Sequence, residues 1–231
     1  MRRVALLAPM HPELRPLVRR LALRRAPAAG GALFTGALGR LELVAALAGI
    51  GTRAAARATE RLLDAMPVDH LVVVGIAGGV GAGVRVGDLV VPERVVDLAT
   101  GSVHRPAPLG AAVARGTLAT SDALVVDPER LAGLAREGVV AIDMETAAIA
   151  AVCERRGVAW SVFRAVSDLA GRGPVDAEIL RLAGPDGRPA TLAVARFLLT
   201  RPWRVPQLAR LGLDARRATR TAADAAAAAL A

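Results

Sequence analysis

Acidic residues directly follow two apolar runs of this sequence, and each run is typical of a buried strand. The acidic segment 143–145 follows the apolar run 139–142, and Asp168 follows the run that begins at Trp160. Open α/β sheets bind their ligands outside the carboxyl ends of the strands. Two acids placed there can divide proton donation and substrate binding between them. The spacing therefore predicts an enzyme that acts on a small molecule.

Two further features follow apolar runs nearer the start of the chain. Glu13 comes after the run 4–9, and a glycine-rich segment, 75–79, comes after the run 70–74. Glycines let the backbone approach a ligand closely and expose amide donors. If the strands are parallel, all four features lie along one edge of the sheet, and together they define a candidate site.

Apolar periodicity predicts strands that alternate with helices along most of the chain. We expect strands over 4–9, 32–37, 40–48, 70–74, 88–91, 117–121, 139–142 and 160–166. We expect helices over 12–25, 54–65, 128–136 and 145–156, and a surface loop over 95–108. This alternation is typical of a single α/β domain with a mixed, largely parallel central sheet flanked by helices. We expect a catalytic domain over 1–196, and a basic amphipathic helical extension over 197–231 whose Ala-rich end frays.

Composition excludes several other classes of protein. The chain has 231 residues and a net charge of +9, and its 30 basic residues are all Arg. These arginines are spread out and not interleaved with stacking aromatics, so we expect no nucleic-acid partner. One cysteine, Cys153, and three scattered histidines predict no disulfide, no metal site and no cofactor. The sequence lacks a run of about 20 apolar residues and a leader-like start, which favours a cytoplasmic location.

The order of the motifs resembles that of the nucleoside phosphorylase superfamily, and above all its methylthioadenosine/S-adenosylhomocysteine nucleosidases. The shared motifs are APM over 8–10 with Glu13, LAGIG over 47–51, GIAGG over 75–79, VGDLV over 86–90, DMETAA over 143–148 and RAVSD over 164–168. They span roughly the first three quarters of the chain. The resemblance therefore implies the same fold, and also a homodimer.

The resemblance further implies cleavage of the N-ribosidic bond of a purine nucleoside. Because a purine anion is a poor leaving group, Asp168 would protonate it, which requires a pKa raised by burial. Glu145 would bind the ribose hydroxyls as the sugar gains oxocarbenium character. Glu13 would deprotonate the attacking water. The remaining substrate contacts implied by the resemblance are Met144 beneath the ribose, Ala77, Gly78, Val125 and Ser167.

Few residues decide whether the nucleophile is water or phosphate. A phosphorylase must hold a phosphate dianion with Arg side chains and with hydroxyl or amide donors. Ile76 stands where members of the family often carry Ser or Thr, and Glu13 would repel phosphate, so we expect a hydrolase. Arg53 lies near a predicted helix N-terminus, which is a favourable anion site, and keeps phosphorolysis as the alternative.

Two departures from the family pattern concern the base and the 5′ substituent. Leu124 stands where the family has a phenylalanine that contacts the base, so stacking on the purine is weaker. The stretch between Asp97 and Thr117 is short, which opens the 5′ side to a bulky group. We therefore expect a 5′-substituted adenosine as the substrate.

The C-terminal segment mixes arginines with leucines and Trp203, and resembles the hopanoid-associated branch of the superfamily. Members of that branch remove adenine from an adenosylated hopane lipid. The substrate hypothesis thus covers adenosylhopane-like as well as methylthioadenosine- and S-adenosylhomocysteine-like nucleosides. A basic amphipathic segment with Trp also suits peripheral contact with an anionic membrane.

Two other classes of function compete with the nucleosidase. Gly49–Ala54 fits a relaxed dinucleotide-binding fingerprint, with Asp69 about 20 residues further on. That acid precedes the next strand, whereas a ribose-binding acid should follow it, so a nicotinamide-dependent oxidoreductase is disfavoured. A lipid-binding module without catalysis would retain all of its function when Asp168 is replaced by Asn.

Overall fold

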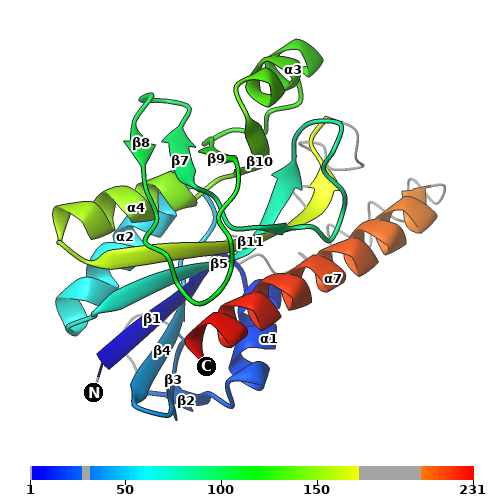
Figure 1. Cartoon of the computed structure of the whole chain (residues 1–231). Helices are drawn as coiled ribbons and strands as arrows, with labels where there is room; N and C mark the ends of the chain where they lie inside the picture. Colours follow the sequence, from blue (N-terminus) through cyan, green and yellow to red (C-terminus); the bar gives the residue numbers. More distant parts are fainter. Residues whose placement is uncertain (1, 28–31, 172–203) are drawn as a thin grey trace.

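The computed structural model describes residues 2–27, 32–171 and 204–231. In these residues, eleven strands form one sheet with helices on both of its faces (Figure 1). The strands are β1 (Arg2–Ala8), β2 (Arg24–Ala26), β3 (Leu33–Leu38), β4 (Leu41–Leu47), β5 (His70–Gly79), β6 (Leu89–Val90), β7 (Arg94–Asp97), β8 (Val103–His104), β9 (Thr117–Thr120), β10 (Val139–Asp143) and β11 (Ala159–Leu169). The helices are α1 (His11–Arg20), α2 (Thr52–Ala65), α3 (Pro128–Arg136), α4 (Thr146–Arg155) and α7 (Val205–Leu230).

The sheet is mixed, as the sequence predicts, and its long strand β5 lies at the centre. Its strands follow the order β2-β3-β4-β1-β5-β10-β9-β7-β8, and β11 pairs with both β5 and β6. The pairs β1 with β4, β1 with β5, and β11 with β5 are parallel. β10 is antiparallel to β5 but parallel to β9. The strands expected over 32–37 and 40–48 form a hairpin, since β3 and β4 are antiparallel neighbours.

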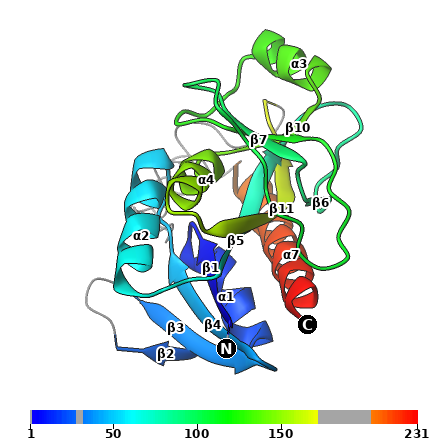
Figure 2. The same ribbon diagram turned by 60° about the vertical axis from the view of Figure 1, so that its left-hand side comes forward.

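Both faces of the sheet are buried, because successive side chains of a strand point to opposite faces. In β1, Ala5 and Leu7 belong to the core cluster that also contains residues of α2 and α4. Val4 and Leu6 belong to the cluster that contains residues of α1 and α7. Figure 2 shows α2 and α4 on one side of the sheet, and α1 and α7 on the other. The continuous apolar strands of the sequence follow from this arrangement.

The Ala-rich end of the chain does not fray, which corrects the prediction made for 222–231. Ala222 and Ala226 are fully buried, and α7 packs against β11, β5 and α1. A Cβ atom added at Gly110 would lie 2.6 Å from Cα of Ala229, so a loop also closes over the end of the helix. Alanine favours helix, and its small side chain lets a helix lie close to a sheet. The predicted boundary between 196 and 197 lies outside the described residues, but α7 itself is part of the core.

Three predicted segments differ in their secondary structure, and one of them is the glycine-rich segment 75–79, which belongs to β5 instead of following the strand. The helix expected over 12–25 ends at Arg20, the chain turns through Ala22 at a φ of 49°, and β2 then pairs with β3. The loop expected over 95–108 contains β7 and β8, which form an antiparallel pair. β2 and β8 have only three and two residues, and the short apolar part of β7 lies in a polar, proline-containing stretch, so the sequence pattern predicts none of the three. Among the described helices, none is long and apolar enough to cross a membrane.

Candidate active site

The predicted site residues come together at one edge of the sheet. Strands β1, β4, β5 and β11 run in the same direction, so their carboxyl ends lie together. β10 reaches the same place from the opposite direction, because Ile142 pairs with Gly78 near the end of β5. A pocket of about 630 Å³ lies there. It is lined by all eight residues that the sequence predicts: Glu13, Ala77, Gly78, Val125, Met144, Glu145, Ser167 and Asp168.

A buried arginine lies beneath this pocket and pairs with its acids. Arg164 of β11 has no solvent exposure, and its Nη2 lies 2.7 Å from Asp143 Oδ2 and 3.2 Å from Glu145 Oε2. Its Nη1 lies 3.8 Å from Glu13 Oε1 and donates to the carbonyl of Ile76. Burial alone would lower the pKa of Arg164, but the three carboxylates raise it. The cation therefore stays charged and fixes the acids around it.

Glu13 is held by backbone amides as well as by Arg164. Its Oε1 accepts a hydrogen bond from the amide of Ile76, and its Oε2 accepts one from the amide of Met10, each at 2.8 Å. Burial raises the pKa of Glu13 to about 8, although the charge of Arg164 opposes this shift. A carboxyl group with such a pKa can exchange a proton near neutral pH.

Asp168 lies at the end of β11, beyond an irregularity in its pairing with β5. Burial raises the pKa of Asp168, and the hydrogen bond that the hydroxyl of Ser167 donates to its Oδ1 at 2.6 Å opposes the shift. Ser167 also donates to the carbonyl of Ala77 at 3.4 Å. A raised pKa keeps a carboxyl group protonated, which is what a proton donor requires.

Two carboxylates accept hydrogen bonds from amides at the N-terminus of α2. This is the place where Arg53 suggests a phosphate site in the sequence. The amide of Gly51 donates to Oε1 of Glu145 at 3.0 Å. The amide of Thr52 donates to Oδ1 of Asp122 at 3.0 Å, and its hydroxyl binds the same oxygen. Arg53 is exposed. Burial raises the pKa of Glu145, and the attraction of Arg164 opposes this.

Gly75 makes room for the charged cluster. A Cβ atom added there would collide with Oε1 of Glu13 and would lie 2.5 Å from Nη1 of Arg164. At Gly78 the nearest atom to such a Cβ is Cβ of Ala170, at 3.7 Å, which is an ordinary contact. The glycine at position 75 is therefore required by close packing, whereas position 78 has room for a methyl group.

Sequence reasoning missed several residues of the site. The sequence alone assigns no role to Arg164, although the RAVSD motif contains it. Leu211 and Ala215 of α7 and Ile50 also line the pocket. Nothing in the sequence indicates that α7 reaches the pocket, since this depends on how the helix crosses the sheet.

The dinucleotide-binding alternative is inconsistent with the position of Asp69. Its Oδ2 accepts a hydrogen bond from the amide of Arg3, near the start of β1. This is the amino end of the parallel strands, whereas Gly51 lies at their carboxyl end. An acid at the opposite edge of the sheet cannot bind a ribose beside Gly51.

The phosphorylase superfamily sequence model matches residues 3–109 and 102–198 of the chain. A 5′-methylthioadenosine/S-adenosylhomocysteine nucleosidase of Geobacillus thermodenitrificans is 32% identical over 200 residues, covering 73% of this chain and 85% of that protein. Among solved structures, the corresponding nucleosidase of Neisseria meningitidis, in complex with methylthio-immucillin-A, has a TM-score of 0.73 at 22% identity. That match covers 100% of this chain and 99% of the other. Futalosine hydrolase of Helicobacter pylori has a TM-score of 0.73 at 19% identity, covering 99% and 97% of the two chains. The chain belongs to the phosphorylase superfamily.

Proposed function

We propose that this protein is a purine nucleosidase, which hydrolyses the N-ribosidic bond of a 5′-substituted adenosine and releases adenine. The observation that carries the proposal is one pocket that contains Asp168 with a pKa raised by burial, Glu13 anchored by backbone amides, and Glu145 held by Arg164. The nucleosidase relative, which matches 73% of the chain, supports the same reaction.

Asp168 supplies the proton for the leaving group. Departure of adenine places negative charge on the purine, and protonation of a ring nitrogen relieves it. Burial raises the pKa of Asp168, which favours the protonated form that this step requires. Ser167 holds one carboxyl oxygen of Asp168, so the other oxygen is left to face the base.

Glu145 holds the ribose, and Met144 packs beneath the sugar. One oxygen of Glu145 accepts from the amide of Gly51, and the other lies 3.2 Å from Arg164. Both contacts fix the carboxylate before the substrate arrives. A fixed negative group beside the ribose favours the positive charge that the sugar gains in the transition state.

Glu13 activates the attacking water. Its two oxygens are oriented by the amides of Met10 and Ile76, and Arg164 lies behind it. With a pKa of about 8, the carboxyl group gains ionised character as the pH rises toward that value. A base whose pKa lies near the working pH combines ionisation with proton affinity.

Phosphorolysis remains the second candidate, because of Arg53, but the donors that a phosphate would need are already engaged. The amides of Gly51 and Ile76 donate to Glu145 and Glu13. The charge of Arg164 is offset by its three acidic neighbours. A phosphate dianion would have to displace carboxylates that repel it, whereas a neutral water molecule does not.

The lining of the pocket favours a substrate whose 5′ substituent is apolar. Met10, Ile50, Leu124 and Leu211 give the pocket mostly apolar walls. These walls suit the methylthio group of methylthioadenosine, and also a longer hydrocarbon such as that of an adenosylhopane. Such a lipid substrate is the finer form of the proposal and would place the protein in hopanoid biosynthesis.

Release of adenine, followed by chromatography, tests the reaction. The substrates are methylthioadenosine, S-adenosylhomocysteine, adenosine and a long-chain 5′-alkyl adenosine, each with and without phosphate. We expect release that does not depend on phosphate, and the preferred 5′ group identifies the substrate class. Release that requires phosphate would establish the phosphorylase, and release from none of them would leave the adenine assignment unsupported.

We further propose a cytoplasmic homodimer that can contact a membrane peripherally. Val103 and Val113 are 53% and 83% exposed, which supports a covered face in an oligomer.

Leu213 of α7 is 63% exposed and lies among arginines, which supports contact with an anionic bilayer. Because α7 belongs to the core, the membrane test uses Leu213→Ser in the full chain rather than a truncation. Equal co-sedimentation with anionic vesicles would exclude that contact, and sedimentation velocity tests the dimer.

A further inference from the structure

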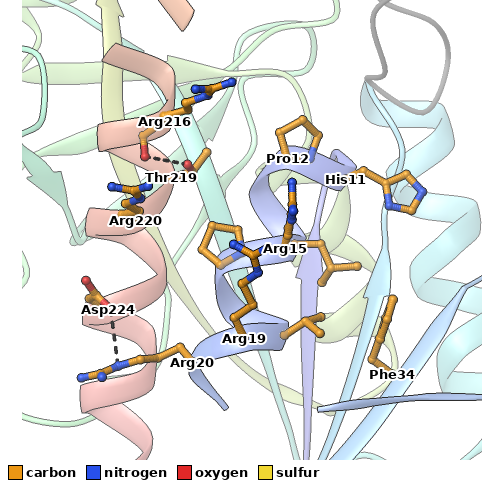
Figure 3. Close-up of a pocket in the computed structure, with 13 residues that line it drawn as sticks. His11, Pro12, Arg15, Arg19, Arg20, Phe34, Arg216, Thr219, Arg220 and Asp224 are labelled. Carbon is orange, nitrogen blue, oxygen red and sulfur yellow. Dashed lines mark hydrogen bonds and ion pairs between the residues drawn. The ribbon is translucent and has the colours of Figure 1, made fainter. Parts of the chain in front are cut away.

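A second hollow, separate from the active-site pocket, lies between α1 and α7 (Figure 3). Its volume is about 940 Å³. We call it the α1–α7 groove. Five arginines line it: Arg15, Arg19 and Arg20 from α1, and Arg216 and Arg220 from α7. Figure 3 shows the two arginines of α7 across the hollow from those of α1.

The arginines of the α1–α7 groove have little acidic compensation. Asp224 is the only acidic residue among the described lining residues, and it pairs with Arg20 at 3.4 Å. Within residues 2–27, 32–171 and 204–231, the other four arginines have no carboxylate within ion-pair distance. Like charges on two helices that pack together repel one another, and an anion between them would relieve the repulsion.

We propose that the α1–α7 groove binds a small molecule that carries two or more phosphate groups. The guanidinium group is a planar fork that binds phosphate oxygens in pairs, so arginines on both walls suit several phosphate groups better than one carboxylate. Pro12, Pro16 and Phe34 add apolar surface to the lining, which suits a ligand with a nonpolar body. The volume lies in the range of sites for ligands of this size.

Charge excludes two other occupants. A divalent cation is repelled by the arginines, and the single acid of the groove is already paired. A second copy of the chain, docked symmetrically on this face, would place one set of five arginines against the other. The nucleosidase reaction does not use the groove, so the proposal holds or fails independently of that function.

Calorimetric titration of the full chain with tripolyphosphate, at constant ionic strength, tests the proposal. The test variant is Arg15→Gln with Arg216→Gln. The matched control is Arg57→Gln with Arg61→Gln, which removes the same charge from positions on α2 that are exposed, as Arg15 and Arg216 are, but lie outside the groove. We expect saturable binding to the wild type, weakened about tenfold or more in the groove variant and unchanged in the control. Equal weakening in both variants, or no saturable binding to the wild type, would overturn the proposal.

Thermal unfolding without the anion gives a second readout. The groove variant loses like-charge repulsion, so we expect it to unfold at no lower temperature than the wild type, and to lose the stabilisation that tripolyphosphate gives. A groove variant that tripolyphosphate stabilises as much as it stabilises the wild type would contradict the assignment.

Vesicles distinguish a lipid headgroup from a free phosphate compound as the natural source. Co-sedimentation is measured with vesicles that contain cardiolipin, whose headgroup carries two phosphates, and with vesicles of phosphatidylcholine alone. Binding to the cardiolipin vesicles that tripolyphosphate displaces, and that the groove variant lacks, identifies the headgroup. Tripolyphosphate binding without vesicle binding identifies a free phosphate compound. Vesicle binding that the groove variant retains, in a chain that does not bind tripolyphosphate, would contradict the proposal.

Discussion

Arg164 joins the three acids of the site into one electrostatic unit. It is fully buried and lies within 3.8 Å of a carboxylate oxygen of Glu13, Asp143 and Glu145. A buried cation with several acidic partners stabilises their ionised forms, while burial opposes ionisation. The balance differs between residues, because Asp168 lies outside this cluster and has only Ser167 to oppose its burial. These unequal surroundings allow Asp168 to act as the proton donor while the acids around Arg164 bind the substrate and the water.

The Asp168→Asn substitution tests the role of the proton donor. Asparagine keeps the shape of the side chain but cannot donate an acidic proton. We expect adenine release from methylthioadenosine to fall roughly hundredfold or more. Circular dichroism and the melting temperature should stay close to those of the wild type. Full activity in a folded variant would remove Asp168 from the mechanism.

The raised pKa of Glu13 predicts a specific dependence of stability on pH. Its pKa rises from 4.5 to about 8 on folding, so the folded state binds this proton more tightly. The contribution of Glu13 to the free energy of unfolding is complete below the pKa of the unfolded state, and it is lost as the pH rises through about 8. For one proton, the free energy of unfolding falls by at most roughly 1.4 kcal/mol per pH unit. Urea denaturation between pH 5 and 8 measures it.

Replacing Glu13 by Gln removes this titration, so we expect a shallower decline of stability across the same pH range. The matched control is Glu60→Gln, at a partly exposed residue paired with Arg155 on the surface. The control should keep the slope of the wild type. An unchanged slope in Glu13→Gln would show that Glu13 titrates alike in the folded and unfolded states.

At the scale of elements, the approach of α1 and β11 to Gly75 of β5 positions the acids, and α7 completes the lining of the pocket. Gly75 lies where α1 delivers Glu13 and β11 delivers Arg164, and no side chain fits there. α7 supplies Leu211 and Ala215 to the pocket, and alanines to the core. The longer strands are predictable from the sequence, because each is a continuous apolar run and these runs alternate with amphipathic helices. The burial of α7 is not predictable, because alanine is common on exposed and buried helix faces alike.

Gly75→Ala and Gly78→Ala form a matched pair on β5. A methyl group at Gly75 would collide with Glu13 and Arg164, whereas at Gly78 it meets only ordinary contacts. We expect Gly75→Ala to lower the free energy of unfolding by about 1–3 kcal/mol. Gly78→Ala should leave it close to the wild-type value. Equal values from urea denaturation would contradict the position of the charged cluster.

Substitutions on α7 test whether its Ala-rich end is part of the core. Ala226 is fully buried, whereas Ala228 is exposed. We expect Ala226→Leu to overpack the contact with the sheet and to destabilise the protein by about 1–3 kcal/mol. Ala228→Leu should have little effect. A frayed helix end would instead tolerate both substitutions equally.

At the scale of the whole molecule, the sheet separates two layers, and α1 and α7 share one of them. Each of these two helices contributes both to the active-site pocket and to the α1–α7 groove. The strand ends bring together residues up to 155 positions apart, from Glu13 to Asp168. The sequence indicates that Glu13 and Asp168 meet, because β1 and β11 are parallel to β5 and end on one edge, whereas β10 brings Glu145 there while antiparallel to β5. It does not indicate Arg164 at their centre or the arginines that face each other, since both depend on packing between distant elements.

The most direct measurement is the cleavage of methylthioadenosine in heavy-oxygen water without phosphate, followed by mass spectrometry of the sugar. If water is the nucleophile, adenine is released and the sugar carries one heavy oxygen at the carbon that held the base. The Asp168→Asn variant should yield neither product at a comparable rate. Adenine that forms only when phosphate is added, together with a sugar phosphate, would contradict hydrolysis.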